Sequence, residues 1–356
     1  MNKIQNPKSK IQRHEGKRVL IVRLDRIGDV LLSTPVIKAV RDVCPDGYIA
    51  FMVRRYAKDI LEGNPYLDEI IVYDKNGREK GLLRNLGFIR SLRRKKFDIA
   101  LILHPTKRTH LLVSLAGIPE TVGYNRKWGF LLTTRLPHTK QYGLKHEIDY
   151  TLDILRYTGL EPKDKPLYMP VNGHSEVRVD EMLREGGIGK DDLCVAINPG
   201  ASCPSKRWSP DKFARAAQAL IERYGVKIIV VASAADKELG DRVSNRLKKN
   251  CLNLAGRTSV ADVASVLRRA RLFISNDSGP VHIACAVGTP VIAIFGRHDR
   301  GLSPQRWGPT GKRDVVLHKD VGCIECLAHD CAKGFQCLEA VTVDEVLAAA
   351  AKILGR

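Results

Sequence analysis

The 356-residue sequence lacks the features that mark several common protein classes. No apolar run approaches the ~18 residues that a helix needs to span a bilayer. The first sixteen residues are polar and basic and have no apolar core, which argues against a secretory signal. We expect a disordered basic tail over residues 1–16 and a protein of the cytoplasm.

Three nucleotide-binding signatures are also missing. No G-x-G-x-x-G follows a strand-like run, so the dinucleotide fingerprint is absent, and no G-K-[ST] marks a P-loop. No D-x-D occurs, which argues against a diphosphate held by a metal ion. Aromatic residues make up only 6% and no nucleic-acid recognition module is visible, so a nucleic-acid-binding protein stays only as an alternative.

Basic residues are abundant and unevenly placed. The net charge is +20, and residues 1–170 hold 32 Lys and Arg against 18 Asp and Glu, a net +14. Such a first half indicates an anionic partner, namely nucleic acid, an anionic membrane surface or a phosphorylated substrate. A basic surface kept for solubility would give the same count.

Short apolar runs alternate with amphipathic stretches twice along the chain, which predicts two α/β domains with mostly parallel sheets. A proline-containing stretch, 161–173, reads as the linker between a domain over 17–160 and another over 174–340. A last helix lies within 341–356. The predicted strands are 18–24, 48–53, 69–73, 98–103, 193–198, 227–232, 271–275 and 290–295. The predicted helices are 28–43, 54–62, 83–96, 107–116, 145–158, 209–224, 236–248, 260–269, 279–287 and 341–354.

The loop after the first strand reads RLDRIGDVLLSTP (23–35). Gly28 would allow a tight turn, and Asp29 would then fall in the first turn of the next helix, where the helix dipole favours a carboxylate. An ionised Asp29 facing a cleft can act as a general base. The local alternative is that it only caps its own helix.

A second loop, NPGASCPSKRWSPDKF (198–213), follows the first strand of the second half. Its small residues, including Ser202, permit close approach of a phosphate, and Lys206 and Arg207 supply positive charge. The alternative is a solvated basic loop.

In a third segment, 232–243, Glu238 opens a helix and could hold ribose hydroxyls, or simply be an exposed acidic residue.

The most specific local pattern is SNDSGPVHIACAVGTPVIAIFG (275–296). A strand there ends in Asp277, Ser278 and Gly279, and a helix begins whose free N–H groups offer an anion site. His282 lies in its first turn. Taken alone, such a residue is more often a structural histidine.

Four of the nine cysteines are clustered as C-x2-C-x4-C-x5-C. Three interpretations stay open, namely a zinc site, a labile disulfide, or reduced structural thiols. The cluster comprises Cys323, Cys326, Cys331 and Cys337.

Taken together, these segments resemble glycosyltransferase family 9, the ADP-heptose:lipopolysaccharide heptosyltransferases. The similarity rests on IVRLDRIGDVLLSTP, NPGASCPSKRW and SNDSGPVHIACAVGTPVIAIFG in that order, with CIECLAHDCAKGFQC and AVTVDEV after them, and spans about residues 17–350. It implies a GT-B fold of two facing Rossmann-like domains, with the acceptor on the first, the donor on the second, and a last helix that crosses back to the first domain.

The resemblance further implies inverting transfer of heptose from ADP-heptose to the inner core of lipopolysaccharide, by a monomer that needs no metal or other cofactor. Alternatives are another nucleotide sugar or acceptor, a nucleotide-sugar epimerase, or an inactive relic. Carried over residue by residue, Asp29 matches the proposed base, and Ser202 and Lys206 match the phosphate contacts. The donor motif is matched by Asp277, Ser278, Gly279 and His282, and Glu238 aligns loosely with a ribose contact.

A glycolipid acceptor would require reversible attachment to the cytoplasmic face of the inner membrane. The segment Arg84–Lys96 (RNLGFIRSLRRKK) places basic residues beside Leu86, Phe88, Ile89 and Leu92 at helical spacing. It is therefore a candidate for contact with anionic lipid. The alternative is that its apolar residues pack on the sheet of their own domain.

Overall fold

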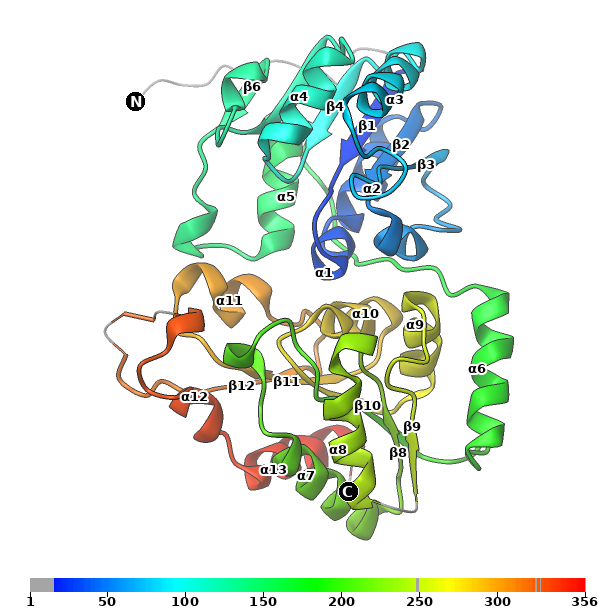
Figure 1. Ribbon diagram of the computed structural model, residues 1–356, viewed down its shortest axis with the longest axis vertical. Helices are drawn as coiled ribbons and strands as arrows, with labels where there is room; N and C mark the ends of the chain where they lie inside the picture. Colours follow the sequence, from blue (N-terminus) through cyan, green and yellow to red (C-terminus); the bar gives the residue numbers. More distant parts are fainter. Residues whose placement is uncertain (1–15, 248–249, 324, 327, 356) are drawn as a thin grey trace. The chain divides into compact units, whose positions relative to one another are not determined.

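The structure is a computed structural model that describes residues 16–247, 250–323, 325–326 and 328–355 (Figure 1). The chain divides into two compact units. The first comprises the residues up to Gln141 with Glu147–Pro170, and the second comprises Tyr142–His146 with Val171 onward. The unit boundary at Pro170 falls inside the predicted linker. The predicted tail lies outside the described residues, apart from Gly16.

Six parallel strands form the sheet of the first unit, in the order β3-β2-β1-β4-β5-β6. The runs RVLIV and IALI are buried along almost their whole length, as expected for central strands covered on both faces. Because β1 lies between β2 and β4, the order of the strands reverses beside it, and ligands of open α/β sheets bind at such a point. The strands are β1 (Arg18–Val22), β2 (Tyr48–Val53), β3 (Glu69–Val72), β4 (Ile99–Ile102), β5 (Glu120–Tyr124) and β6 (Thr134–Leu136).

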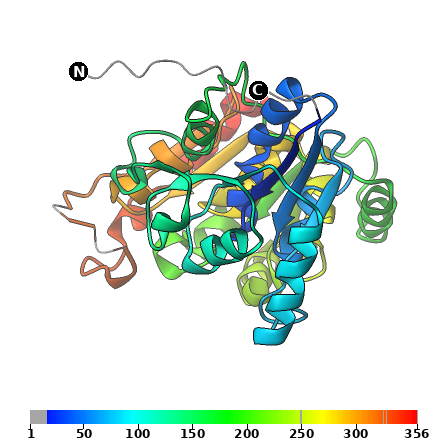
Figure 2. The same ribbon diagram turned by 90° about the horizontal axis from the view of Figure 1, so that it is seen from above.

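The helices of the first unit lie in two layers, since α2 contacts α5 while α3 contacts α4 (Figure 2). The single helix predicted over 28–43 is wrong. Pro35 has no N–H to donate to the Leu31 carbonyl, which instead accepts a hydrogen bond from the Thr34 hydroxyl, 2.8 Å away, so the chain breaks into two helices. The predicted helix 54–62 is a 3-10 helix. The helical segments are α1 (Ile27–Leu31), α2 (Thr34–Val43), η1 (Arg55–Ile60), α3 (Leu82–Arg94), α4 (Lys107–Leu115), η2 (Gly129–Leu131), η3 (Lys140–Tyr142) and α5 (Glu147–Arg156).

The second unit repeats the plan with a parallel sheet in the order β12-β11-β10-β7-β8-β9. Its reversal point lies at β7, between β10 and β8. The strands are β7 (Cys194–Asn198), β8 (Lys227–Val230), β9 (Cys251–Asn253), β10 (Leu272–Asn276), β11 (Val291–Phe295) and β12 (Val315–His318). The helical segments are α6 (Gly173–Glu185), η4 (Pro204–Lys206), α7 (Pro210–Tyr224), η5 (Ala234–Asp236), α8 (Lys237–Leu247), α9 (Val260–Arg269), α10 (Gly279–Val287), η6 (Arg300–Leu302), α11 (Pro304–Trp307), η7 (Ala328–Asp330), α12 (Gln336–Glu339) and α13 (Val343–Leu354).

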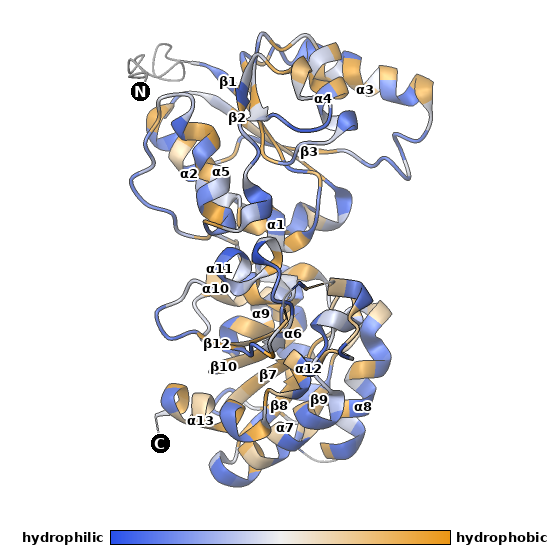
Figure 3. Cartoon of the chain, turned by 90° about the vertical axis from the view of Figure 1, so that its left-hand side faces the viewer, coloured by the Kyte–Doolittle hydropathy of each residue, from blue (hydrophilic) through white to orange (hydrophobic). Residues whose placement is uncertain are grey.

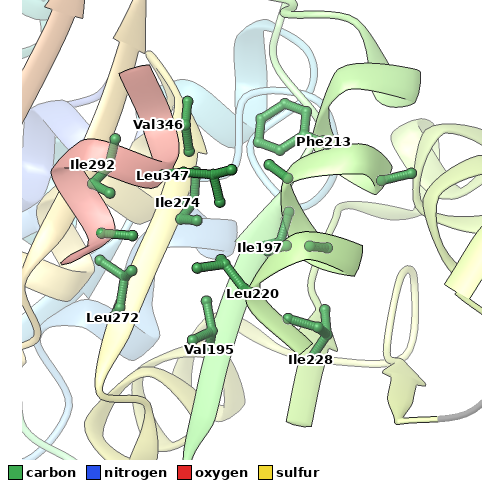
Figure 4. Packing of buried hydrophobic residues seen from close by; sticks show 14 of the residues in the cluster. Val195, Ile197, Phe213, Leu220, Ile228, Leu272, Ile274, Ile292, Val346 and Leu347 are labelled. Atoms are coloured by element: carbon green, nitrogen blue, oxygen red, sulfur yellow. The ribbon is translucent and has the colours of Figure 1, made fainter. Parts of the chain in front are cut away.

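The last helix, α13, belongs to the second unit, so the expectation that it crosses back to the first domain is wrong. Its apolar face is buried against α7 and the strands β10, β11 and β12 (Figure 4). Val346 and Leu347 pack in one cluster with Leu220 and Ile274. The helix begins with the predicted capping box of Thr342 and Glu345. Its apolar stripe is therefore already satisfied by its own sheet.

This placement predicts the effect of Leu347→Ala. The side chain is 5% exposed, and truncation of a buried leucine costs about 2–5 kcal/mol. We expect that loss in urea unfolding followed by fluorescence, because Trp208 lies in the same core. Ala348→Ser, at an exposed position of α13, is the control and should change stability by less than about 0.5 kcal/mol. A loss confined to the first unit's transition would contradict the placement.

Candidate functional site

A buried arginine organises the carboxyl end of β1. Arg23, 2% exposed, directs its guanidinium at three carboxylates. Its Nε lies 2.7 Å from Asp25 Oδ1, its Nη2 lies 2.7 Å from Asp29 Oδ1, and its Nη1 lies 3.1 Å from Glu147 Oε1. One side chain therefore joins the loop after β1, the helix α1 and the helix α5.

A second cation completes this charge cluster. The Nζ atom of Lys140 lies 2.6 Å from Oε1 of Glu147, whose side chain is fully buried. The same ammonium lies over the rings of Tyr124 and Tyr150, 4.9 and 5.7 Å from their centroids. Three carboxylates thus share two cations, which leaves one negative charge in excess when all are ionised. That excess falls on the more accessible acids, since Glu147 is enclosed by both cations.

Asp29 is a partly exposed carboxylate of this charge cluster with a pKa near neutrality. Burial and the neighbouring charge of Asp25 raise the pKa of Asp29 to about 6, although Arg23 opposes the shift. Burial also raises the pKa of Asp25, and it lowers the pKa of His104 to about 4, with the charge of Arg23 acting in the same direction. At neutral pH, His104 is therefore neutral, and Asp29 is an ionised carboxylate able to accept a proton.

The structure separates two local expectations for this loop. Asp29 lies in the first turn of α1, as predicted, but its carboxylate contacts Arg23, and the N-cap residue of α1, Arg26, makes no side-chain cap. The alternative that Asp29 only caps its own helix is therefore not supported. Gly28 does not form the turn, because it lies inside α1 with helical backbone, and the turn falls at Leu24–Arg26.

In the second unit, the phosphate-loop candidate and the strand-end motif meet at the carboxyl edge of the sheet. Lys206, at the end of η4, places its Nζ 2.6 Å from Oδ2 of Asp277, which follows β10. Their side chains are 15% and 8% exposed. The pair lies beside the reversal point of the sheet, where ligands of this fold class bind.

Two asparagines that the sequence reading missed hold this edge together. Asn198, the last residue of β7, donates from Nδ2 to the Ser278 hydroxyl, 2.9 Å away, and accepts from the N–H of Gly200. Asn276 accepts from the N–H of Trp208 and donates to the carbonyl of Pro199. The loops after β7 and β10 are thus fixed to one another by buried amides.

Gly200 makes room for a neighbouring side chain, whereas its small size predicted close approach of a phosphate. A Cβ atom there would lie 2.8 Å from Oδ2 of Asp236, so the position admits that side chain rather than a phosphate. Arg207 donates to Asp236 Oδ1 at 2.8 Å and to the carbonyl of Ala201. Arg207 therefore docks the loop after β8 onto the loop after β7.

The first turn of α10 has the properties of an anion site. Ser278 precedes the helix without capping it, and Gly279 and Pro280 leave its start free of bulky side chains. His282 is 4% exposed, and its Nδ1 has no hydrogen-bond partner among the described residues. Burial lowers the pKa of His282 to about 3, and the charges of His146 and Lys206 act in the same direction. A buried neutral ring without a partner is consistent with a site that a ligand completes.

The remaining predicted residues lie at the margin of this edge. Ser202 is exposed on the loop after β7, and Glu238 is exposed in the first turn of α8.

Arg297, which no sequence pattern indicated, is buried behind the loop after β7 in a left-handed backbone conformation. It donates to the Ser205 hydroxyl at 3.1 Å and to Cys203 Sγ at 2.7 Å. Arg297 therefore supports the turn that presents Lys206.

The cysteine cluster lies near Arg297. All nine cysteines are free thiols in the structure. Across the described residues, no three His, Cys, Asp or Glu side chains are placed to hold a metal ion. Cys326 accepts a hydrogen bond from the N–H of His298, and Cys331 accepts one from the N–H of Phe335. Two thiols of the cluster thus accept hydrogen bonds from backbone N–H groups.

Two Rossmann-like domains, each with a polar site at the carboxyl edge of a parallel sheet, define a GT-B fold. A sequence profile of glycosyltransferase family 9 (heptosyltransferase) matches residues 86–335. The chain therefore belongs to glycosyltransferase family 9, and it is a glycosyltransferase.

Its relatives agree with this assignment over almost the whole chain. The lipopolysaccharide heptosyltransferase 2 of Escherichia coli K12 is 26% identical over 344 residues, which are 93% of this chain and 96% of that protein. The crystal structure of a family 9 glycosyltransferase from Veillonella parvula superimposes with a TM-score of 0.87 at 26% identity, covering 97% and 99% of the two chains. E. coli heptosyltransferase II superimposes with a TM-score of 0.78 at 22% identity, covering 95% and 99%.

Electrostatics within the charge cluster predict the effect of Glu147→Gln. The negative charge of Glu147 raises the pKa of Asp29, so its removal should move that pKa below about 6. Titration of the labelled Asp29 carboxyl carbon by NMR measures the shift directly. Glu161→Gln, in the same unit and 78% exposed, is the control and should leave it unchanged. An unchanged or higher pKa in Glu147→Gln would contradict the described geometry.

Proposed function

We propose that this protein transfers heptose from ADP-heptose to the inner core of a lipopolysaccharide precursor, with inversion at the anomeric carbon and without a metal ion. Membership of family 9 and the names of the relatives support the donor and acceptor classes. The observation that carries the chemistry is Asp29, an accessible carboxylate held by Arg23 at the carboxyl edge of the first sheet. We further propose that the enzyme acts as a monomer at the cytoplasmic face of the inner membrane.

In this proposal, the first unit binds the acceptor. Asp29 takes the proton from an acceptor hydroxyl as its oxygen attacks the anomeric carbon of the donor, and the bond from that carbon to the diphosphate breaks. Arg23 keeps the carboxylate oriented, and its charge limits how far burial raises the pKa. The pKa of about 6 leaves Asp29 ionised at pH 7 and still basic enough to accept a proton.

The second unit binds the donor in the same proposal. Lys206 and the start of α10 face the negative charge that develops on the departing diphosphate, with His282 beside them. Ser202 contributes a hydroxyl from the loop, and Glu238 contacts the ribose. Cationic and backbone donors at this edge, in a sequence without D-x-D, support transfer that needs no metal.

Replacement of the base gives the first test. Asp29→Asn should fold and bind ADP as the wild type does, and turnover should fall about 10²–10⁴-fold, the usual range for a general base. In the wild type, kcat/KM should decline below about pH 6, because protonation of Asp29 removes the base. Asp42→Asn, on the surface of the same unit, is the control. Turnover of Asp29→Asn near that of the control would remove Asp29 from the mechanism.

Replacement of Lys206 gives the second test. A charge-assisted hydrogen bond contributes about 1.5–3 kcal/mol. Lys206→Ala should therefore weaken ADP binding in calorimetry while adenosine binding changes little. The change also leaves Asp277 without its cation, so Lys206→Ala/Asp277→Asn should recover part of the loss. Equal losses for ADP and adenosine would show that Lys206 does not contact the phosphates.

A further inference from the structure

The helix α3 exposes more apolar surface than a helix packed on a sheet requires. Ile89 and Leu92 are buried, and Phe88 packs on the core with its ring 5.0 Å from that of Tyr73. The expectation that these three contact lipid is therefore wrong. Near its start, however, Leu82 is 77% exposed and Leu83 is 82% exposed.

The neighbouring helix extends this apolar surface. The exposed fraction is 46% for Leu86 of α3, and 40% and 43% for Leu111 and Leu115 of α4. The latter two are four residues apart and so share one side of their helix. Figure 3 shows α3 and α4 together with hydrophobic segments on both. We call Leu82, Leu83, Leu86, Leu111 and Leu115 the leucine surface.

Hydrogen bonds show that the two helices run side by side in the same direction. At their starts, Asn85 of α3 and Arg108 of α4 both contact the hydroxyl of Tyr73. At their ends, Arg93 of α3 donates to the carbonyl of Leu115 at 2.7 Å. The leucine surface thus belongs to one helical layer, with Leu82, Leu83 and Leu86 in the first turns of α3 and Leu115 at the end of α4, beside Arg93.

Positive charge borders these leucines. Residues 75–96 hold nine basic side chains and one acidic side chain. The acidic one, Glu79, is buried, whereas Arg84, Arg90 and Arg94 are exposed on α3 itself. Long basic side chains with leucines between them are typical of helices that lie at the interface of an anionic bilayer. A contact surface for a neutral protein would not need this charge.

The start of α3, which carries Leu82, Leu83 and Leu86, suits a lipid-linked acceptor. Tyr73 follows β3, so the first turns of α3 and α4 lie at the carboxyl edge of the sheet, the edge that also holds Asp29. In the strand order, β3 is two strands from β1, roughly 10 Å. A bilayer at the start of α3 would thus present a headgroup near the base.

We propose that the leucine surface, with Arg84, Arg90 and Arg94, docks this protein on an anionic lipid bilayer. The proposal rests on the proposed function for its purpose, but the binding is a property of the first unit and needs no donor or acceptor. The leucines enter the headgroup region and the arginines contact lipid phosphates.

Vesicle sedimentation with the full chain tests this, using phosphatidylglycerol–phosphatidylcholine vesicles and pure phosphatidylcholine vesicles. The wild type should bind the anionic vesicles, and less so at high salt. Leu82→Ser/Leu83→Ser/Leu86→Ser, which changes no charge, should weaken that binding at least about tenfold. Its control, Val177→Ser/Leu193→Ser, removes exposed apolar side chains of the second unit and should bind as the wild type does.

A charge-reversal pair separates a local surface from the overall charge of +20. Arg90→Glu/Arg94→Glu should weaken binding at least about tenfold, whereas Arg215→Glu/Lys190→Glu, equal in charge and exposed on the second unit, should change it less than about threefold. Equal effects of the two pairs, or no effect of the leucine changes, would overturn the proposal. So would a change of oligomeric state in the leucine variant in sedimentation velocity without lipid, since that would identify a protein partner.

Transfer to a detergent-dispersed acceptor keeps this proposal separate from the proposed function. The leucine variant should retain full turnover there, because none of its changes touches Asp29 or the donor site. Loss of vesicle binding with full turnover supports both proposals. Vesicle binding without any turnover would reject the proposed function and leave the docking surface standing.

Discussion

The first unit depends on one buried guanidinium. Arg23 could not be buried without carboxylates to balance its charge, and those carboxylates could not be buried without Arg23. Because Asp25, Asp29 and Glu147 come from two different parts of the chain, the same contacts that neutralise the charge fix α5 against the end of β1. The carboxylate proposed as the base is thus oriented by an interaction that the fold itself requires.

In the second unit, the corresponding loops are held mainly by neutral amides. Buried amides of Asn198 and Asn276 fix the loops after β7 and β10, and Arg297 supports the turn from behind. The pair of Lys206 and Asp277 brings charge to the edge itself, beside the pair of Arg207 and Asp236. This difference suits the proposed chemistry, since a base needs a tuned carboxylate, whereas a diphosphate needs a cation and free backbone donors.

Much of the fold could be predicted from the sequence, because buried parallel strands read as continuous apolar runs. The eight predicted strands all occur. The sequence did not predict the edge strands β6 (TRL), β9 (CLN) and β12 (VVLH), nor β5 (ETVGY), which lies inside the first sheet but lacks a continuous apolar run. Pro35 indicates the break after Leu31, because proline cannot donate the next helical hydrogen bond, yet the apolar spacing predicts one continuous helix over 28–43. The placement of α13 could not be predicted, since an amphipathic helix fits any sheet face that is open to it.

The site was predictable only where a local sequence pattern marks a residue. Asp29, Lys206 and Asp277 lie in segments that follow predicted strands and carry recognisable motifs. The structure places them at the carboxyl edges of the two sheets. Glu147 is 124 residues from Arg23, and no local pattern connects the two. In the segment Arg84–Lys96, the alternative that apolar residues pack on their own sheet is confirmed for Ile89 and Leu92, whose burial depends on the sheet beneath α3.

The central claim is heptosyl transfer, and incubation of the purified protein with ADP-heptose and a lipopolysaccharide core precursor tests it most directly. Mass spectrometry of the lipid and measurement of free ADP would follow the reaction. We expect that the lipid gains one heptosyl residue for each ADP released, with the new linkage inverted at the anomeric carbon. Release of free or altered sugar without acceptor, or transfer only from another nucleotide sugar, would contradict it.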